Sequence, residues 1–73
     1  MTKDQQYLID SLISHLHVRI MTKMNLSFLD AQDLLYHSET YDLINDVETG
    51  LYLQSACYNY ELLEQEIKFG KIA

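Results

Sequence analysis

Apolar residues recur every four positions through the first third of the chain, and this pattern limits the possible folds more than any other feature. The recurring residues are Leu8, Leu12, Leu16, Ile20 and Met24, with Ile9 and Ile13 beside them. At about 100° per residue, their side chains fall within an arc of about 160°. The pattern therefore predicts an amphipathic helix of roughly twenty residues that buries this face.

Capping signals place the boundaries of this helix and of the two that follow. Residues 2–5 match a capping box, in which the side chains of Thr2 and Gln5 each accept the other's backbone N–H. Ser27 opens a second helix, and Ser38 opens a short third helix through residue 46. A single helix bent at Ser38 is the alternative. The residues expected to face inward from these helices are Phe28, Ala31, Leu34, Leu35, Tyr41, Ile44 and Val47.

The rest of the chain contains a turn and one more helix. Gly50 predicts a turn over residues 48–50, followed by an extended segment over residues 51–53. Ser55 caps a last helix over residues 56–69, which Gly70 ends in the left-handed conformation. We therefore predict a single all-α domain over residues 1–73, a small bundle of three main helices plus a short connecting helix.

Composition is typical of a soluble globular domain. The chain has 73 residues, is 48% hydrophobic and contains one cysteine, which excludes a disordered chain and a disulfide framework. The longest uncharged run is too short to span a bilayer, and residues 1–24 lack the basic start and apolar block of a signal peptide. We expect a cytoplasmic protein with no membrane partner.

The chain is acidic, and its net charge of −6 is unevenly distributed. Residues 25–67 contain nine acidic residues and no lysine or arginine. Affinity for nucleic acid depends on cationic groups that displace counterions from the phosphates, so this segment is not expected to bind DNA or RNA. The acidic block has two interpretations: a solvated surface, which is the usual role of net charge, or a docking surface for a basic protein.

The sequence contains no motif for catalysis or metal binding. His15 and His17 are two residues apart, which points them to different sides of a helix, and His37 lies elsewhere. Cys57 falls in the first turn of the last helix with no histidine base near it in the sequence, and we expect it to be a small buried residue. We predict that the protein is not an enzyme and uses no metal or cofactor.

The last helix is apolar on two sides. One stripe consists of Ala56, Tyr60, Leu63 and Ile67, and the other, about 150° away, of Tyr58, Leu62 and Phe69. In a chain this short only one stripe fits the core. The second stripe is either covered by residues 51–53 or forms an interface with another chain, which would also stabilise the small core.

The first helix carries a weaker charge-free stripe opposite its Leu/Ile face, formed by Tyr7, Ser11, Ser14 and Val18. Its small central residues would allow another helix to approach closely. The predicted partner-binding residues are Tyr58, Leu62, Phe69, Tyr7 and Val18.

A resemblance to known proteins extends over about half of the chain. Its residues are Leu34-Leu35-Tyr36, Tyr41-Asp42-Leu43-Ile44 and Tyr60-Glu61-Leu62-Leu63-Glu64, preceded by a Leu-rich first helix. In this patterning the chain resembles a broad group of short, all-helical bacterial proteins of unknown function, some of them encoded beside toxin-like genes. The resemblance implies a bacterial accessory protein, such as an antitoxin-like partner, and assigns no functional residue.

Together these features predict a non-enzymatic, helical protein–protein interaction module that forms a homo-oligomer or docks a protein partner, with a basic protein as one candidate. The alternative is a small oligomeric regulator that contacts nucleic acid through a composite basic patch. That patch would consist of Arg19, Lys23, Lys68 and Lys71.

Overall fold

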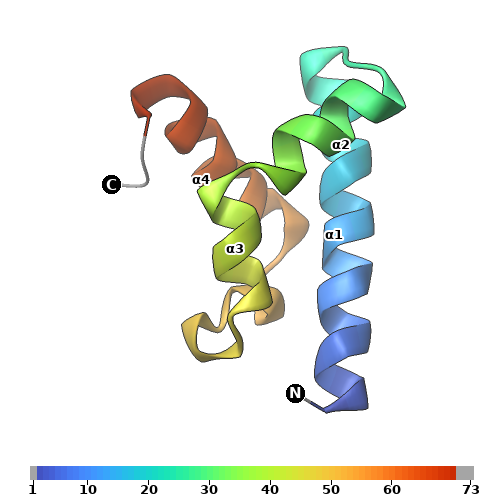
Figure 1. The fold of residues 1–73 in the computed structure, drawn as a ribbon, viewed down its shortest axis with the longest axis vertical. Helices are drawn as coiled ribbons and strands as arrows, with labels where there is room; N and C mark the ends of the chain where they lie inside the picture. The colour runs from blue at the N-terminus through green and yellow to red at the C-terminus, as the bar shows by residue number, and fades with distance from the viewer. Residues whose placement is uncertain (1, 71–73) are drawn as a thin grey trace.

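Four α-helices and two single-turn 3-10 helices follow one another in the computed structural model, which describes residues 2–70 (Figure 1). The α-helices are α1 (Lys3–Met24), α2 (Phe28–Tyr36), α3 (Glu39–Asn45) and α4 (Ala56–Phe69). The 3-10 helices η1 (Val47–Thr49) and η2 (Leu51–Leu53) join α3 to α4. The predicted all-α bundle is confirmed. No helix within residues 2–70 is long and apolar enough to cross a membrane.

The predicted caps form as expected. The Thr2 hydroxyl accepts the Gln5 backbone N–H at 3.1 Å, and the Gln5 side chain accepts the Thr2 N–H at 2.9 Å. The hydroxyls of Ser27, Ser38 and Ser55 each accept the backbone N–H three residues later. Because Ser38 caps α3 separately, α2 and α3 are two helices rather than one bent helix.

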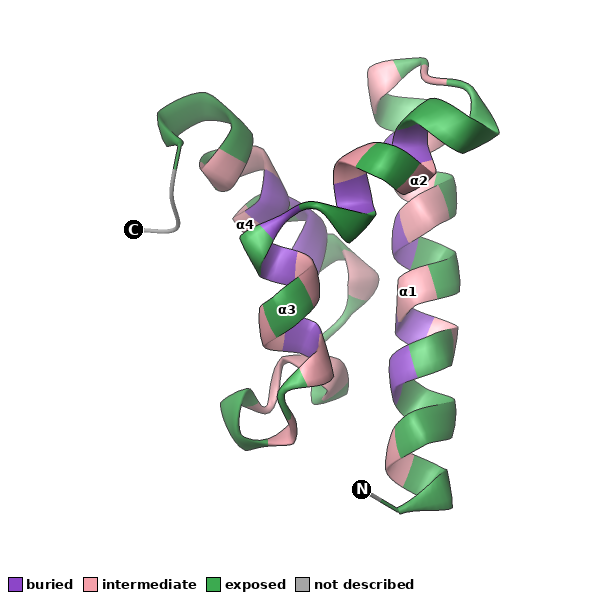
Figure 2. Ribbon diagram, viewed as in Figure 1, coloured by how far each residue is buried: buried purple, intermediate pink, exposed green. Residues whose placement is uncertain are grey.

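The core lies between α1 and the three shorter α-helices (Figure 2). Its fully buried large side chains include Leu16, Leu35, Ile44 and Leu63, each from a different helix. The core also contains Ile9, Leu12, Ile20, Ala31 and Tyr60.

Two residues predicted to face inward are exposed instead. Leu8 is 41% exposed because it lies at the edge of the apolar arc of α1. Phe28 begins α2 and packs at a tilt against the ring of His17 on α1, with ring centroids 4.4 Å apart, so it covers the side of α1 instead of entering the core.

The prediction of an extended segment over residues 51–53 is wrong. Gly50 adopts a left-handed conformation with φ of 71°, after which Leu53 and Gln54 donate to the carbonyls three residues earlier and close the turn η2. Leu51 and Tyr52 pack against the core, whereas Leu53 is 66% exposed.

One carboxylate joins α4 to the start of α3. The Glu66 side chain accepts the backbone N–H groups of Glu39 at 2.8 Å and Thr40 at 3.0 Å, and also the Thr40 hydroxyl at 2.9 Å. A negative charge at a helix N-terminus is favourable because the first backbone N–H groups there have no partner within the helix. This contact fixes the rotation of α4, and so decides which of its faces remain open.

Candidate interaction surface on the last helix

The two stripes of α4 differ sharply in burial. On the inner side Tyr60 and Leu63 are buried, as predicted, and the fully buried Asn59 lies beside them. Ile67, which was expected to continue this stripe, is 46% exposed. Ile67 lies near the C-terminal end of α4, one turn beyond Leu63, the last buried residue of this helix.

The outer stripe of Tyr58, Leu62 and Phe69, which we call the Tyr58 stripe, faces solvent. Tyr58 is 47% exposed, Phe69 is 70% exposed and Leu62 is half-buried. Residues 51–53 do not cover it, because Leu51 and Tyr52 pack on the core instead. The Tyr58 stripe is therefore an apolar surface that the monomer leaves open.

Tyr7 and Val18, the other two predicted partner-binding residues, are exposed on the outer face of α1. Eleven residues of helix separate them, which is about 16 Å along the axis. Val18 borders the start of α4, because it lines a groove together with Ala56 of that helix, whereas Tyr7 lies toward the N-terminal end of α1.

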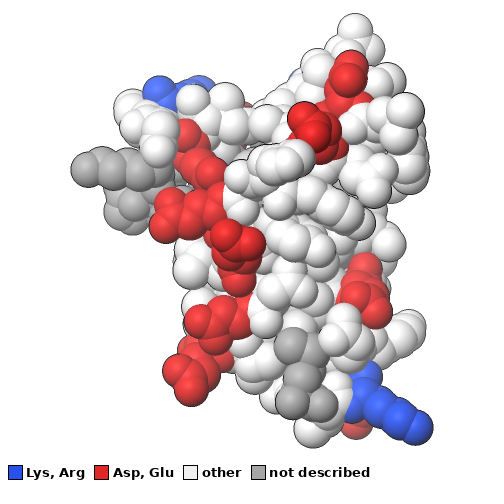
Figure 3. Space-filling model, in the orientation of Figure 1, with Lys and Arg blue, Asp and Glu red and all other residues white. Residues whose placement is uncertain are grey.

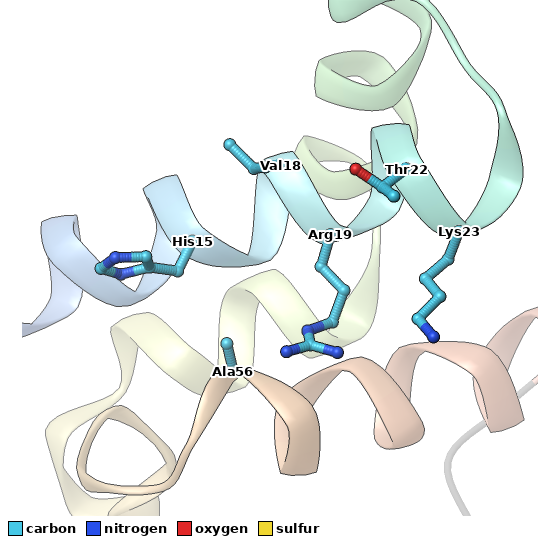
Figure 4. Close-up of a pocket in the computed structure, with 6 residues that line it drawn as sticks. All are labelled: His15, Val18, Arg19, Thr22, Lys23 and Ala56. Atoms are coloured by element: carbon cyan, nitrogen blue, oxygen red, sulfur yellow. The ribbon is translucent and has the colours of Figure 1, made fainter.

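A shallow groove of about 450 Å³ runs between α1 and the start of α4 (Figure 4). Its lining includes Val18 and Ala56, and the side chains of Arg19 and Lys23 extend across it toward α4. The sequence alone did not predict this groove, because it forms only when two helices that are distant in sequence come together.

The cationic residues of the alternative function do not form a separate patch. Arg19 and Lys23 also line a second, neighbouring pocket together with Glu61 and Glu64. Lys68 lies 3.7 Å from Glu64, and Lys71 lies outside the described residues. The described cations are therefore interleaved with acids, which weakens the field that a phosphate backbone would require.

Tyr60 lines this second pocket, and its environment disfavours ionisation of the phenol. Burial raises the pKa of the Tyr60 phenol above its ordinary value, and the neighbouring Glu64 carboxylate raises it further, while Arg19 acts in the opposite direction. The neutral phenol is thus favoured in the folded chain. The contribution of Tyr60 to the free energy of unfolding is fully present below about pH 10. It is lost as the pH rises further, because the unfolded chain releases this proton more readily.

We therefore expect Tyr60→Phe to reduce the loss of stability between about pH 9 and about pH 11, since phenylalanine has no proton to release. Thermal melts across this pH range provide the measurement, and Tyr7→Phe, at an exposed phenol, is the matched control. A Tyr60→Phe variant with the same pH profile as the wild type would contradict this linkage.

The histidines and the cysteine are dispersed. His17 contacts the Phe28 carbonyl at 2.9 Å, His15 contacts the Ser11 carbonyl and His37 lies 3.1 Å from Asp33. Within residues 2–70 no group of three or more His, Cys, Asp or Glu could hold a metal ion. Cys57 is exposed, contrary to our expectation, because it lines the second pocket with Arg19 and Lys23 and lies outside the core.

The functional assignment depends on this geometry. Comparisons of the chain with protein-family models, with curated proteins and with solved structures give no match.

Proposed function

We propose that the protein is a non-enzymatic interaction module that buries the Tyr58 stripe against another polypeptide chain, in the first instance a second copy of itself. The observation that supports this proposal is the burial pattern of α4. Its inner side enters the core through Tyr60 and Leu63, while Tyr58 and Phe69 remain 47% and 70% exposed on the other side. A helix that is apolar on two sides normally packs on both.

Self-association also suits the size of the chain. A domain of 73 residues buries a smaller fraction of its surface on folding than a large domain does, and contact with another chain increases that fraction. Aromatic residues are enriched at the centres of protein interfaces, and two of the three side chains in the Tyr58 stripe are aromatic. Since the stripe is short, we expect weak, concentration-dependent association.

Replacing Leu62 by glutamate tests the proposal. Leu62→Glu should leave the monomer folded, because Leu62 is only half-buried, but should abolish association, because the new carboxylate would be buried without a partner in the complex. Sedimentation velocity over a range of protein concentrations measures association, and circular dichroism verifies the fold.

Leu53→Glu is the matched control, since it makes the same chemical change at a leucine that is 66% exposed on η2. It should associate as the wild type does. If Leu62→Glu associates like Leu53→Glu, the Tyr58 stripe is not the interface and the proposal is wrong.

A second candidate is docking of a basic protein partner, as an antitoxin-like accessory protein would require. The surface that favours it lies over α3 and η1, where Figure 3 shows a run of carboxylates. Glu39, Asp42, Asp46 and Glu48 are all exposed there. Binding to a basic partner through this surface would weaken steeply with added salt, whereas association through the apolar Tyr58 stripe would not.

A further inference from the structure

The Tyr58 stripe has the spacing of a helix–helix seam. Tyr58, Leu62, Gln65 and Phe69 follow one another at intervals of four, three and four residues, which keeps them on one line along α4. Aromatic side chains stand at the two ends of this line and Leu62 lies within it. Charged residues border the seam: Glu61 and Lys68 lie along one edge, where Glu61 lines a pocket together with Arg19 and Lys23 of α1.

We infer that α4 pairs with α4 of a second copy in the antiparallel direction, with Tyr58 opposite Phe69 of the second copy. This inference rests on the proposed function and specifies its geometry. In this alignment Leu62 lies opposite Gln65 of the second copy, and each end of the seam contains one tyrosine and one phenylalanine. Such aromatic pairs contribute beyond the area they bury.

Charge decides the direction and the register. In the antiparallel pair, residues at the same edge of the two seams face each other, so Glu61 lies beside Lys68 of the second copy, and the two-fold symmetry repeats the contact. A parallel pair would place Glu61 beside Glu66 of the second copy, which is repulsive. Sliding the antiparallel pair by one heptad would oppose Glu61 with Glu61, or Lys68 with Lys68.

Neither side chain is buried in another contact, although Glu61 lines the pocket that also contains Arg19 and Lys23. Glu61 is exposed and has no hydrogen bond or ion pair among the described residues. Lys68 is also exposed, and its 3.7 Å contact with Glu64 lies on the surface, where such pairs stabilise little. Glu66 on the opposite edge is occupied, because it accepts three hydrogen bonds from α3.

Charge reversal tests the pairing. Glu61→Lys and Lys68→Glu should each weaken association about tenfold, because each turns two attractions per dimer into two repulsions. The double variant, Glu61→Lys with Lys68→Glu, should return to near the wild-type dissociation constant. Sedimentation equilibrium at low salt provides the measurement.

A change in the net charge of the monomer would not by itself weaken association in Glu61→Lys. Glu61→Lys changes the monomer's net charge from −6 to −4, which by itself would favour association of two like-charged copies. Asp10→Lys on the exposed surface of α1 makes the same change in net charge and is the matched control; it should not weaken association. Gln65→Leu should tighten association, since it replaces the one polar residue of the seam by an apolar one.

The outcomes separate the two proposals. If Leu62→Glu abolishes association but the double charge variant does not recover, the Tyr58 stripe is an interface in another arrangement and only the antiparallel pairing is wrong. If the wild type is monomeric at every concentration, both the pairing and the proposed self-association are wrong. Recovery in the double variant, with Asp10→Lys at or below the wild-type dissociation constant, supports the pairing.

Discussion

Leu63→Glu is expected to unfold the chain. Leu63 is fully buried and belongs to the core cluster of the bundle. Truncation of such a leucine alone costs about 2–5 kcal/mol, and an unpaired buried charge costs about as much again. A core in a domain of this size rarely supplies more than about 3–5 kcal/mol, so the variant has no stability left.

Circular dichroism and thermal melts measure this result, and the adjacent leucine provides the control. Leu62→Glu introduces the same carboxylate one residue earlier, at a half-buried position on the other side of α4, and should retain a cooperative melt. A folded Leu63→Glu variant would show that the inner side of α4 has been placed incorrectly.

Asn59→Asp should destabilise the fold by a similar amount, although it only replaces the side-chain amide by a carboxylate. The Asn59 side chain is fully buried, and its Nδ2 donates to the carbonyls of Leu51 at 3.1 Å and Ser55 at 3.0 Å. A carboxylate cannot donate, so it would lie against two carbonyl oxygens without water. We expect a loss of about 3–5 kcal/mol, measured by denaturant unfolding at neutral pH.

Asn59→Leu is the informative comparison, and we expect it to change stability by about 1 kcal/mol or less. Both carbonyls keep a second partner, since Ser55 also accepts the Asn59 backbone N–H and Leu51 accepts the N–H of Gln54. The substitution also removes the Asn59 Oδ1, a buried atom that has no hydrogen-bond partner within residues 2–70. Equal destabilisation by aspartate and leucine would mean that the loss of the two Nδ2 hydrogen bonds, which both variants share, dominates over the buried charge at this position.

Local signals in the sequence were sufficient for the helices. A serine or threonine cap binds an N–H group only three residues away, so the starts of α1 to α4 could be predicted without knowing the tertiary structure. The four-residue repeat likewise located the buried side of α1 from Ile9 to Ile20, because burial follows helical periodicity wherever a neighbouring helix is present.

Polar residues of the interior could not be predicted in this way. The sequence does not mark Asn59, Thr40 or Glu66 as bonded residues, because their hydrogen bonds depend on which segments come together in the fold. Glu66, for example, lies 26 residues from its partner Thr40. Residues 51–53 were misassigned because Leu and Tyr suit a strand as well as a turn, and hydrogen bonds after Gly50 decided between them. The open Tyr58 stripe could be named from spacing alone, but its exposure depended on where residues 51–53 pack.

The Glu66 carboxylate couples the local unfolding of α3 to that of α4. With seven residues, α3 is too short to persist alone in water, because helix nucleation is costly and few bonds follow it. Its first N–H groups are held by a side chain near the far end of α4, so detachment of α4 removes the cap and the packing of α3 together. The two helices therefore form one cooperative unit in local unfolding, and the amide protons of α3 should exchange with solvent only as often as α4 leaves the bundle.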